Sequence, residues 1–123
     1  MIEWILPIKT LSESNTHEHW SVSRLRHIDQ KNAIIWAFHQ HKPIIILPCV
    51  IKIIRIAPRK LDSDNLQSGM KWIRDALADQ IFPGKAAGRA DDSDKITWEY
   101  EQEKGKAKEY SVKIQIKALD EIK

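Results

Sequence analysis

The sequence has little of what stabilises secreted or membrane-spanning proteins. Its one cysteine, Cys49, excludes a disulfide within the chain, which predicts a reducing compartment. Its longest apolar run, residues 44–54, is interrupted by Pro48 and Lys52 and is much shorter than the ~20 residues that cross a bilayer. The first residues carry an acid, Glu3, where a signal peptide needs a base. We therefore expect a cytoplasmic protein that does not associate with a membrane.

Glycine and proline are also scarce, at four and five of 123 residues, which leaves no room for a long flexible linker. Because 42% of the residues are hydrophobic and 30% are charged, we expect one globular domain spanning residues 1–123. The net charge is +3, with +5 in residues 1–60 and −2 in residues 61–123. A protein that bound a polyanion by electrostatics alone would carry more positive charge than this.

The hydrophobic pattern predicts an α+β domain of order β-α-β-α-β-β, with a mixed sheet of about four strands packed by two helices. We expect a strand over residues 2–8, a helix over 17–41 and a buried central strand over 44–56, within which Pro48 indicates a late start or a bulge. A second helix should begin at Asp62 or Asp64 and end near Ile81. Two further strands, around residues 95–101 and 109–117, should pair antiparallel through a hairpin over 103–108.

Helical spacing predicts which side chains face the core. In the first helix the apolar side chains near this spacing are Leu25, Ile28, Ile35 and Trp36, while Arg24, His27 and Lys31 lie on the other face. In the second helix one stripe is apolar (Leu66, Met70, Ile73, Leu77) and the opposite stripe is polar (Asp64, Ser68, Lys71, Asp75). Among the tryptophans, we expect Trp36 and Trp98 in the core, while Trp20 and Trp72 could either pack or stack on nucleic-acid bases. Cys49 should be a small core residue.

Two acidic stretches carry the candidate chemistry. Residues 62–66, Asp-Ser-Asp-Asn-Leu, stand where the central strand leads into the second helix, and this helix start offers free N–H groups. Two aspartates separated by one residue can direct both carboxylates at one hard cation such as Mg²⁺. The second stretch, residues 91–94, reads Asp-Asp-Ser-Asp and precedes the next strand. Together the two stretches contain the three or four carboxylates that one or two cations use in phosphodiester hydrolysis.

These residues resemble the RusA-like Holliday-junction resolvases, a family found mainly in phages and prophages. The family pattern is Asp-x-Asp-Asn-Leu, then a Lys and Asp-x-Leu on the following helix, then Asp-Asp before a strand. The matching segments here are residues 62–66, 75–77 and 91–92, and an N-terminal segment with Leu6-Pro7 and Asn15 is also similar. The family's Lys stands four residues after the second Asp, where this chain has Ser68, but counting back from Asp75 matches it to Lys71.

The resemblance implies a Mg²⁺-dependent homodimeric endonuclease, with Mn²⁺ as a substitute cation, that resolves four-way DNA junctions in recombination and repair. It implies that Asp62, Asp64, Asp91 and Asp92 bind the metal, and that Asp62, Asp64, Asp92 and Lys71 are catalytic. We expect DNA contacts from Asn15 and from the basic residues Arg24, Arg26, Lys31, Arg55, Arg59 and Lys60. Two alternatives stay open: a non-catalytic module of the same fold that binds branched DNA, and an oligomerisation domain whose aspartates only cap helices and turns.

Overall fold

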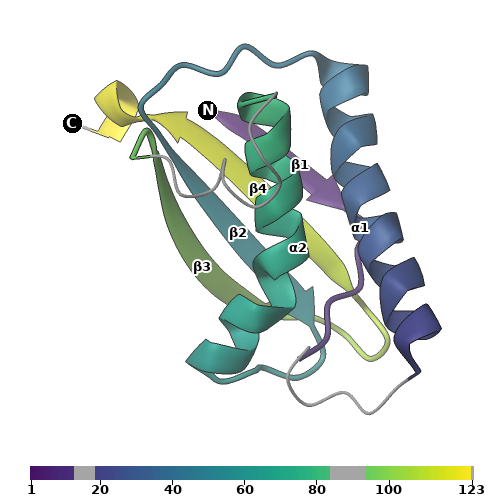
Figure 1. Cartoon of the computed structure of the whole chain (residues 1–123). Helices are drawn as coiled ribbons and strands as arrows, with labels where there is room; N and C mark the ends of the chain where they lie inside the picture. Colours follow the sequence, from purple (N-terminus) through teal and green to yellow (C-terminus); the bar gives the residue numbers. More distant parts are fainter. Residues whose placement is uncertain (13–18, 84–93, 123) are drawn as a thin grey trace.

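The computed structural model describes residues 1–12, 19–83 and 94–122. The chain runs through β1 (Ile2–Leu6), α1 (Trp20–His41), β2 (Cys49–Ala57), α2 (Ser63–Ile81), β3 (Ile96–Lys104), β4 (Ser111–Ala118) and a short 3-10 helix (Leu119–Ile122). α2 lies across one face of the sheet and α1 lies beside it, toward β1 (Figure 1). The α+β class, the order of elements and the mixed four-stranded sheet are therefore confirmed. In the described residues, neither helix is long and apolar enough to cross a membrane.

β2 lies inside the sheet and is paired along both edges. The strand order is β1-β4-β2-β3, in which β2 is parallel to β3 and antiparallel to β4, while β1 is antiparallel to β4. The predicted hairpin between the last two strands is therefore wrong, because β2 separates them. A strand whose side chains are nearly all apolar is better buried between two neighbours than left at a sheet edge.

The connection from β3 to β4 crosses the end of β2. In this crossing the N–H of Gly105 donates to the carbonyl oxygen of Ala57, the last residue of β2, at 2.8 Å. The alternating pattern correctly predicted the buried faces of β3 and β4, on which Ile96 and Ile114 face the core. Alternation has the same period whichever strand lies alongside, so it does not identify the partner.

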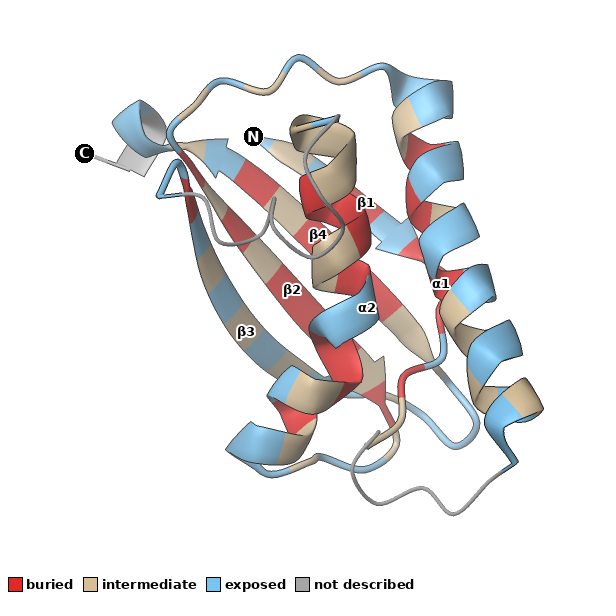
Figure 2. Ribbon diagram, viewed as in Figure 1, coloured by how far each residue is buried: buried red, intermediate tan, exposed pale blue. Residues whose placement is uncertain are grey.

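The core forms between α2 and the sheet, as the sequence predicts. The apolar stripe of α2 is buried, and so are the inward side chains of the two central strands (Figure 2); these residues are Leu66, Met70, Ile73, Leu77, Ile51, Ile53, Val112, Ile114 and Ile116. Pro48 marks a late start of β2, which begins at Cys49. The Cys49 side chain is buried in this core as predicted, and burial raises the pKa of its thiol.

The core face of α1 differs from the prediction. The expected apolar stripe faces solvent: Leu25 and Trp36 are 63% and 58% exposed. The buried residues of the helix are instead Gln30, Ile34 and Ala37. The helix has apolar side chains on two faces, so the side that packs is decided by its neighbours. Gln30 contributes to that choice, because its Nε2 donates to the carbonyl oxygen of Lys9 at 3.0 Å. Trp98, by contrast, packs against the core as predicted.

The segment that follows β1 crosses α2 at a glycine. A Cβ atom built on Gly69 would lie 2.6 Å from the carbonyl oxygen of Leu11, closer than real side chains come to a backbone atom. One turn earlier, the Ser12 hydroxyl donates to Asn65 Oδ1 at 2.6 Å. The absence of a side chain at Gly69 therefore allows this segment to lie against the first turns of α2.

Substituting Gly69 by alanine should destabilise the protein, although alanine normally favours a helix by about 1 kcal/mol over glycine. The new methyl group would overlap the Leu11 carbonyl oxygen, and such overpacking costs about 1–3 kcal/mol. Urea unfolding of Gly69→Ala should show a lower midpoint than the wild type. Gln67→Ala, at an exposed position of the same helix, is the control and should change the midpoint little. A midpoint for Gly69→Ala at or above the wild-type value would contradict this packing.

Candidate functional site

Asp62 and Asp64 lie together where the chain leaves β2 and enters α2. Asp62 is the N-cap of the helix, and its Oδ1 accepts a hydrogen bond from the backbone N–H of Asn65 at 3.0 Å. Asp64 stands in the first turn, and both carboxylates are exposed. A carboxylate has about four acceptor positions, so capping leaves Asp62 free capacity to bind a cation. The positive end of the helix dipole also favours negative charge here.

The loop before Asp62 is held by a glutamine from β3. Gln102 Oε1 accepts a hydrogen bond from the N–H of Leu61 at 2.8 Å, and Gln102 Nε2 donates to the carbonyl oxygen of Leu61 at 2.7 Å. Gln102 is not among the site residues that the sequence predicts. Its signal is that Gln102 follows Trp98 and Tyr100 on the inward side of β3, and a polar side chain on a buried face needs a partner.

Arg55 holds the other side of the same loop from β2. Its guanidinium Nε donates to the Thr10 hydroxyl at 2.9 Å, and its Nη1 donates to the carbonyl oxygen of Arg59. Arg55 is only 5% exposed, and this burial lowers the pKa of its guanidinium, an effect that the nearby Tyr110 partly opposes. A buried side chain engaged in these bonds does not reach DNA, so the structure argues against the predicted phosphate contact. Arg55 positions the loop instead.

The polar stripe of α2 faces outward as predicted, with Asp64 and Lys71 exposed on it. Lys71 lies two turns beyond Asp64, about 10 Å along the helix axis. Its Nζ is 5.5 Å from the centre of the Trp72 ring. Between them, the Ser68 hydroxyl donates to the carbonyl oxygen of Asn65 at 3.1 Å, so Ser68 supplies no charge where the family has its lysine.

The second acidic stretch precedes β3 in the sequence, and β3 begins at the end of the sheet opposite to the point where β2 leads into α2. Of this stretch the structure describes Asp94, which is exposed; Asp91 and Asp92 lie outside the described residues, as does Asn15. β3 starts beside the start of β2, where the N–H of Cys49 donates to the carbonyl oxygen of Lys95 at 2.9 Å. Asp62 and Asp64 follow the opposite end of β2, so one chain does not bring Asp94 to them (Figure 1). Among the described residues, no group of three or more metal-ligating side chains is assembled.

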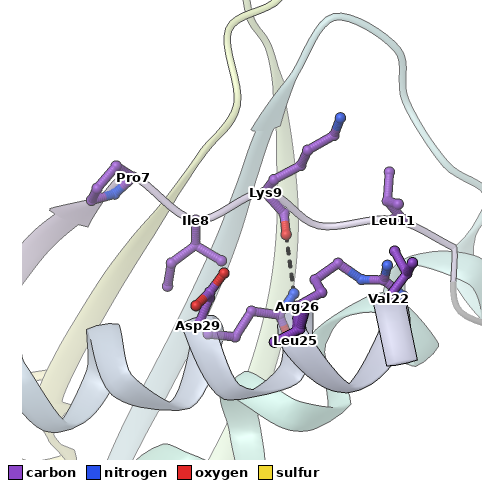
Figure 3. Close-up of a pocket in the computed structure, with 9 residues that line it drawn as sticks. Pro7, Ile8, Lys9, Leu11, Val22, Leu25, Arg26 and Asp29 are labelled. Carbon is purple, nitrogen blue, oxygen red and sulfur yellow. Dashed lines mark hydrogen bonds between the residues drawn. The ribbon is translucent and has the colours of Figure 1, made fainter. Parts of the chain in front are cut away.

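The predicted basic contacts fall on separate surfaces. Arg59 and Lys60 are exposed in the loop just before Asp62. Arg24 and Lys31 line a groove between α1 and α2. Arg26 instead lines a second groove of about 480 Å³, between α1 and the segment after β1 (Figure 3). Of the exposed basic residues predicted to contact DNA, Arg59 and Lys60 lie nearest to the aspartate pair in the sequence.

Replacing Gln102 by leucine should loosen the loop that precedes Asp62. The substitution removes both hydrogen bonds to Leu61 and leaves that residue's N–H and carbonyl oxygen unpaired, at a cost of about 1–3 kcal/mol. Thermal unfolding should therefore occur at a lower temperature. Gln115→Leu is the matched control, because Gln115 lies on the same sheet and donates to the exposed carboxylate of Glu3. Equal stability of the two variants would contradict the assigned role of Gln102.

Comparison with known proteins does not place the chain in a family. No family model, no curated protein and no solved structure matches it. The resemblance to the RusA-like resolvases therefore rests on residues of this sequence, chiefly the segment from Asp62 to Leu66.

Proposed function

We propose that this protein is a Mg²⁺-dependent endodeoxyribonuclease that cleaves four-way DNA junctions. The observation that carries the proposal is the exposed pair Asp62 and Asp64, held at a helix start by a loop that Arg55 and Gln102 pin from two strands. The pinned loop and the helix start fix the backbone at both aspartates, whereas the same residues in a flexible loop would sample many orientations. Rigid placement of ligands is what a cation site needs.

The donor set fits a hard cation. Asp62 and Asp64 supply carboxylate oxygens, and Mg²⁺ prefers one or two carboxylates together with water and phosphate oxygens. When bound there, Mg²⁺ would act as a Lewis acid on the phosphodiester and increase the acidity of a coordinated water. Arg59 and Lys60, exposed beside the pair, would hold the neighbouring phosphates. Lys71 would add positive charge near the phosphoryl oxygens as negative charge develops on them.

The separation of the two acidic stretches favours a homodimer. Eight residue steps along β2 cover about 26 Å, whereas Asp91 stands three residues before Asp94, a reach of at most about 11 Å. We therefore infer that Asp91 and Asp92 of one copy meet Asp62 and Asp64 of another. A two-fold dimer would carry two such sites, which suits a junction cut at two symmetric positions.

A non-catalytic module that binds branched DNA is the second candidate. The specific observation in its favour is Ser68, whose hydroxyl is bonded to Asn65 where the resembling family has its lysine. In that case the aspartates would only cap α2, and the exposed cations would still contact phosphates.

A labelled four-way junction separates these functions. We expect wild-type protein to cut it in Mg²⁺ and not in EDTA, and Asp64→Asn to lose cleavage by at least about 100-fold, because one ligand oxygen becomes an amide. Asp120→Asn removes an exposed carboxylate elsewhere and should cut like the wild type. Binding without cleavage in Mg²⁺ and Mn²⁺ would favour the second candidate. Neither binding nor cleavage would favour a plain oligomerisation domain.

Mg²⁺ should also raise the melting temperature in the absence of DNA. A ligand that binds only the folded protein stabilises it by about 2.7 kcal/mol at 100 times its Kd. Asp62→Asn combined with Asp64→Asn should abolish the increase, and NaCl at equal ionic strength is the control for charge screening. An unchanged melting temperature at millimolar Mg²⁺ would contradict the cation site, even if the protein binds DNA.

A further inference from the structure

A groove of about 570 Å³ runs between α1 and α2, apart from the aspartate pair; we call it the α1–α2 groove. Its aromatic lining comes from both helices, with Trp20 and His27 on α1 and Trp72 on α2. The His27 and Trp72 rings stack across the groove, with centroids 4.3 Å apart and planes inclined by 22°. The volume is within the range of sites that bind small molecules.

The tryptophans of this groove are open to solvent. Trp20 is 67% exposed and Trp72 is 39% exposed. Large apolar side chains that are exposed next to one another are typical of an interaction site or a ligand-binding groove. Trp20 stands in the first turn of α1. It lies apart from the residues that form the buried side of this helix, which are Gln30, Ile34 and Ala37. Neither of these tryptophans belongs to the hydrophobic core cluster.

Charged groups surround the rings. Arg24 and Lys31 stand on the α1 side, while Asp75 and Asp79 stand on the α2 side. An apolar partner helix seated in the groove would take these four groups out of water, which is costly without matched partners. A nucleotide offers such partners. Its phosphates suit Arg24 and Lys31, and the amino groups on base edges suit carboxylate oxygens.

We propose that the α1–α2 groove binds an unpaired nucleotide of DNA, with the base stacked on the exposed ring of Trp20. The faces of bases are available for stacking only where the strand is unpaired, because a duplex covers them with neighbouring bases. The inference rests on the proposed function for its DNA substrate. Trp72 lies eight residues beyond Asp64 on α2, about 12 Å along the axis. A strand held at the aspartate pair would therefore present its unpaired bases to the groove.

The test measures binding in EDTA, so that cleavage plays no part. The probes are a fluorescent single-stranded DNA oligonucleotide of mixed sequence and an oligonucleotide of equal length built from abasic sites. Wild-type protein should bind the intact strand at least about 10-fold more tightly than the abasic strand. Trp20→Ala should bind the intact strand about 5- to 150-fold more weakly, the range for loss of one stacked base. Trp20→Phe, which keeps a ring, should restore most of the affinity.

The control is Trp36→Ala, which removes another exposed tryptophan of the same helix, one that does not line the groove. It should bind like the wild type. Circular dichroism should show that each variant keeps its helix content, because Trp20 is exposed. Loss of binding in Trp36→Ala as well would overturn the assignment to the groove.

Three further outcomes would overturn the proposal: no binding of the intact strand by the wild type, equal binding of intact and abasic strands, or wild-type affinity in Trp20→Ala. If Trp20→Ala instead dissociates a dimer in sedimentation while its DNA affinity is unchanged, a second copy occupies the groove. Base-dependent binding without junction cleavage in Mg²⁺ would support the groove and reject the nuclease. Junction cleavage by a protein that binds the intact and the abasic strand equally would support the nuclease and reject the proposal for the groove.

Discussion

The position of β2 between β3 and β4 is the constraint on which the rest of the molecule depends. Both edges of this strand are hydrogen-bonded, and inward side chains such as Ile51 and Ile53 are fully buried. A shift of register by one residue would turn those side chains to the open face of the sheet. The end of β2 is therefore fixed, and with it the point at which the chain enters α2. β2 therefore sets the position of Asp62 and Asp64, although both residues follow the strand in the sequence.

Two inward-facing polar side chains, the buried Arg55 and the half-buried Gln102, fix the conformation of the loop before α2. Arg55 and Gln102 both face the interior, where a guanidinium or an amide is costly to bury without hydrogen bonds. Each of them bonds a backbone group of the loop before α2. Hydrogen bonds have direction, whereas apolar contacts do not, so these residues specify one conformation of the loop. In this way Arg55 and Gln102 determine where the carboxylates of Asp62 and Asp64 lie, although neither belongs to the aspartate pair.

α2 connects the two surfaces to which we assign DNA. Its first turn carries Asp64, and its outward side carries Lys71 and then Trp72 at the α1–α2 groove. A cation at one end and stacking rings further along would hold one strand at two places. Of the second acidic stretch, the described residue Asp94 stands just before β3, at the opposite end of β2 from Asp62 and Asp64. Under the proposed function, a cation site with more than two carboxylates would draw on two copies of the chain.

Local rules were sufficient for α2. Its apolar residues share one stripe and an aspartate caps its start, and both signals act within a few turns of the same helix. The neighbourhood of Asp62 and Asp64 could also be predicted, because one residue separates them. The late start of β2 followed from Pro48, and the inward faces of β3 and β4 followed from alternation.

The tertiary structure alone decided the partner of each strand and the inward face of α1. Alternation is the same for any neighbour, and α1 has apolar side chains on two sides, so Trp36 is exposed while Ile34 is buried. The roles of Arg55 and Gln102 likewise depend on partners from distant segments. The sequence by itself determined the elements, the α2 stripe and the aspartate pair. Strand order and burial depended on the free energy of the whole core, to which residues far apart in the chain contribute together.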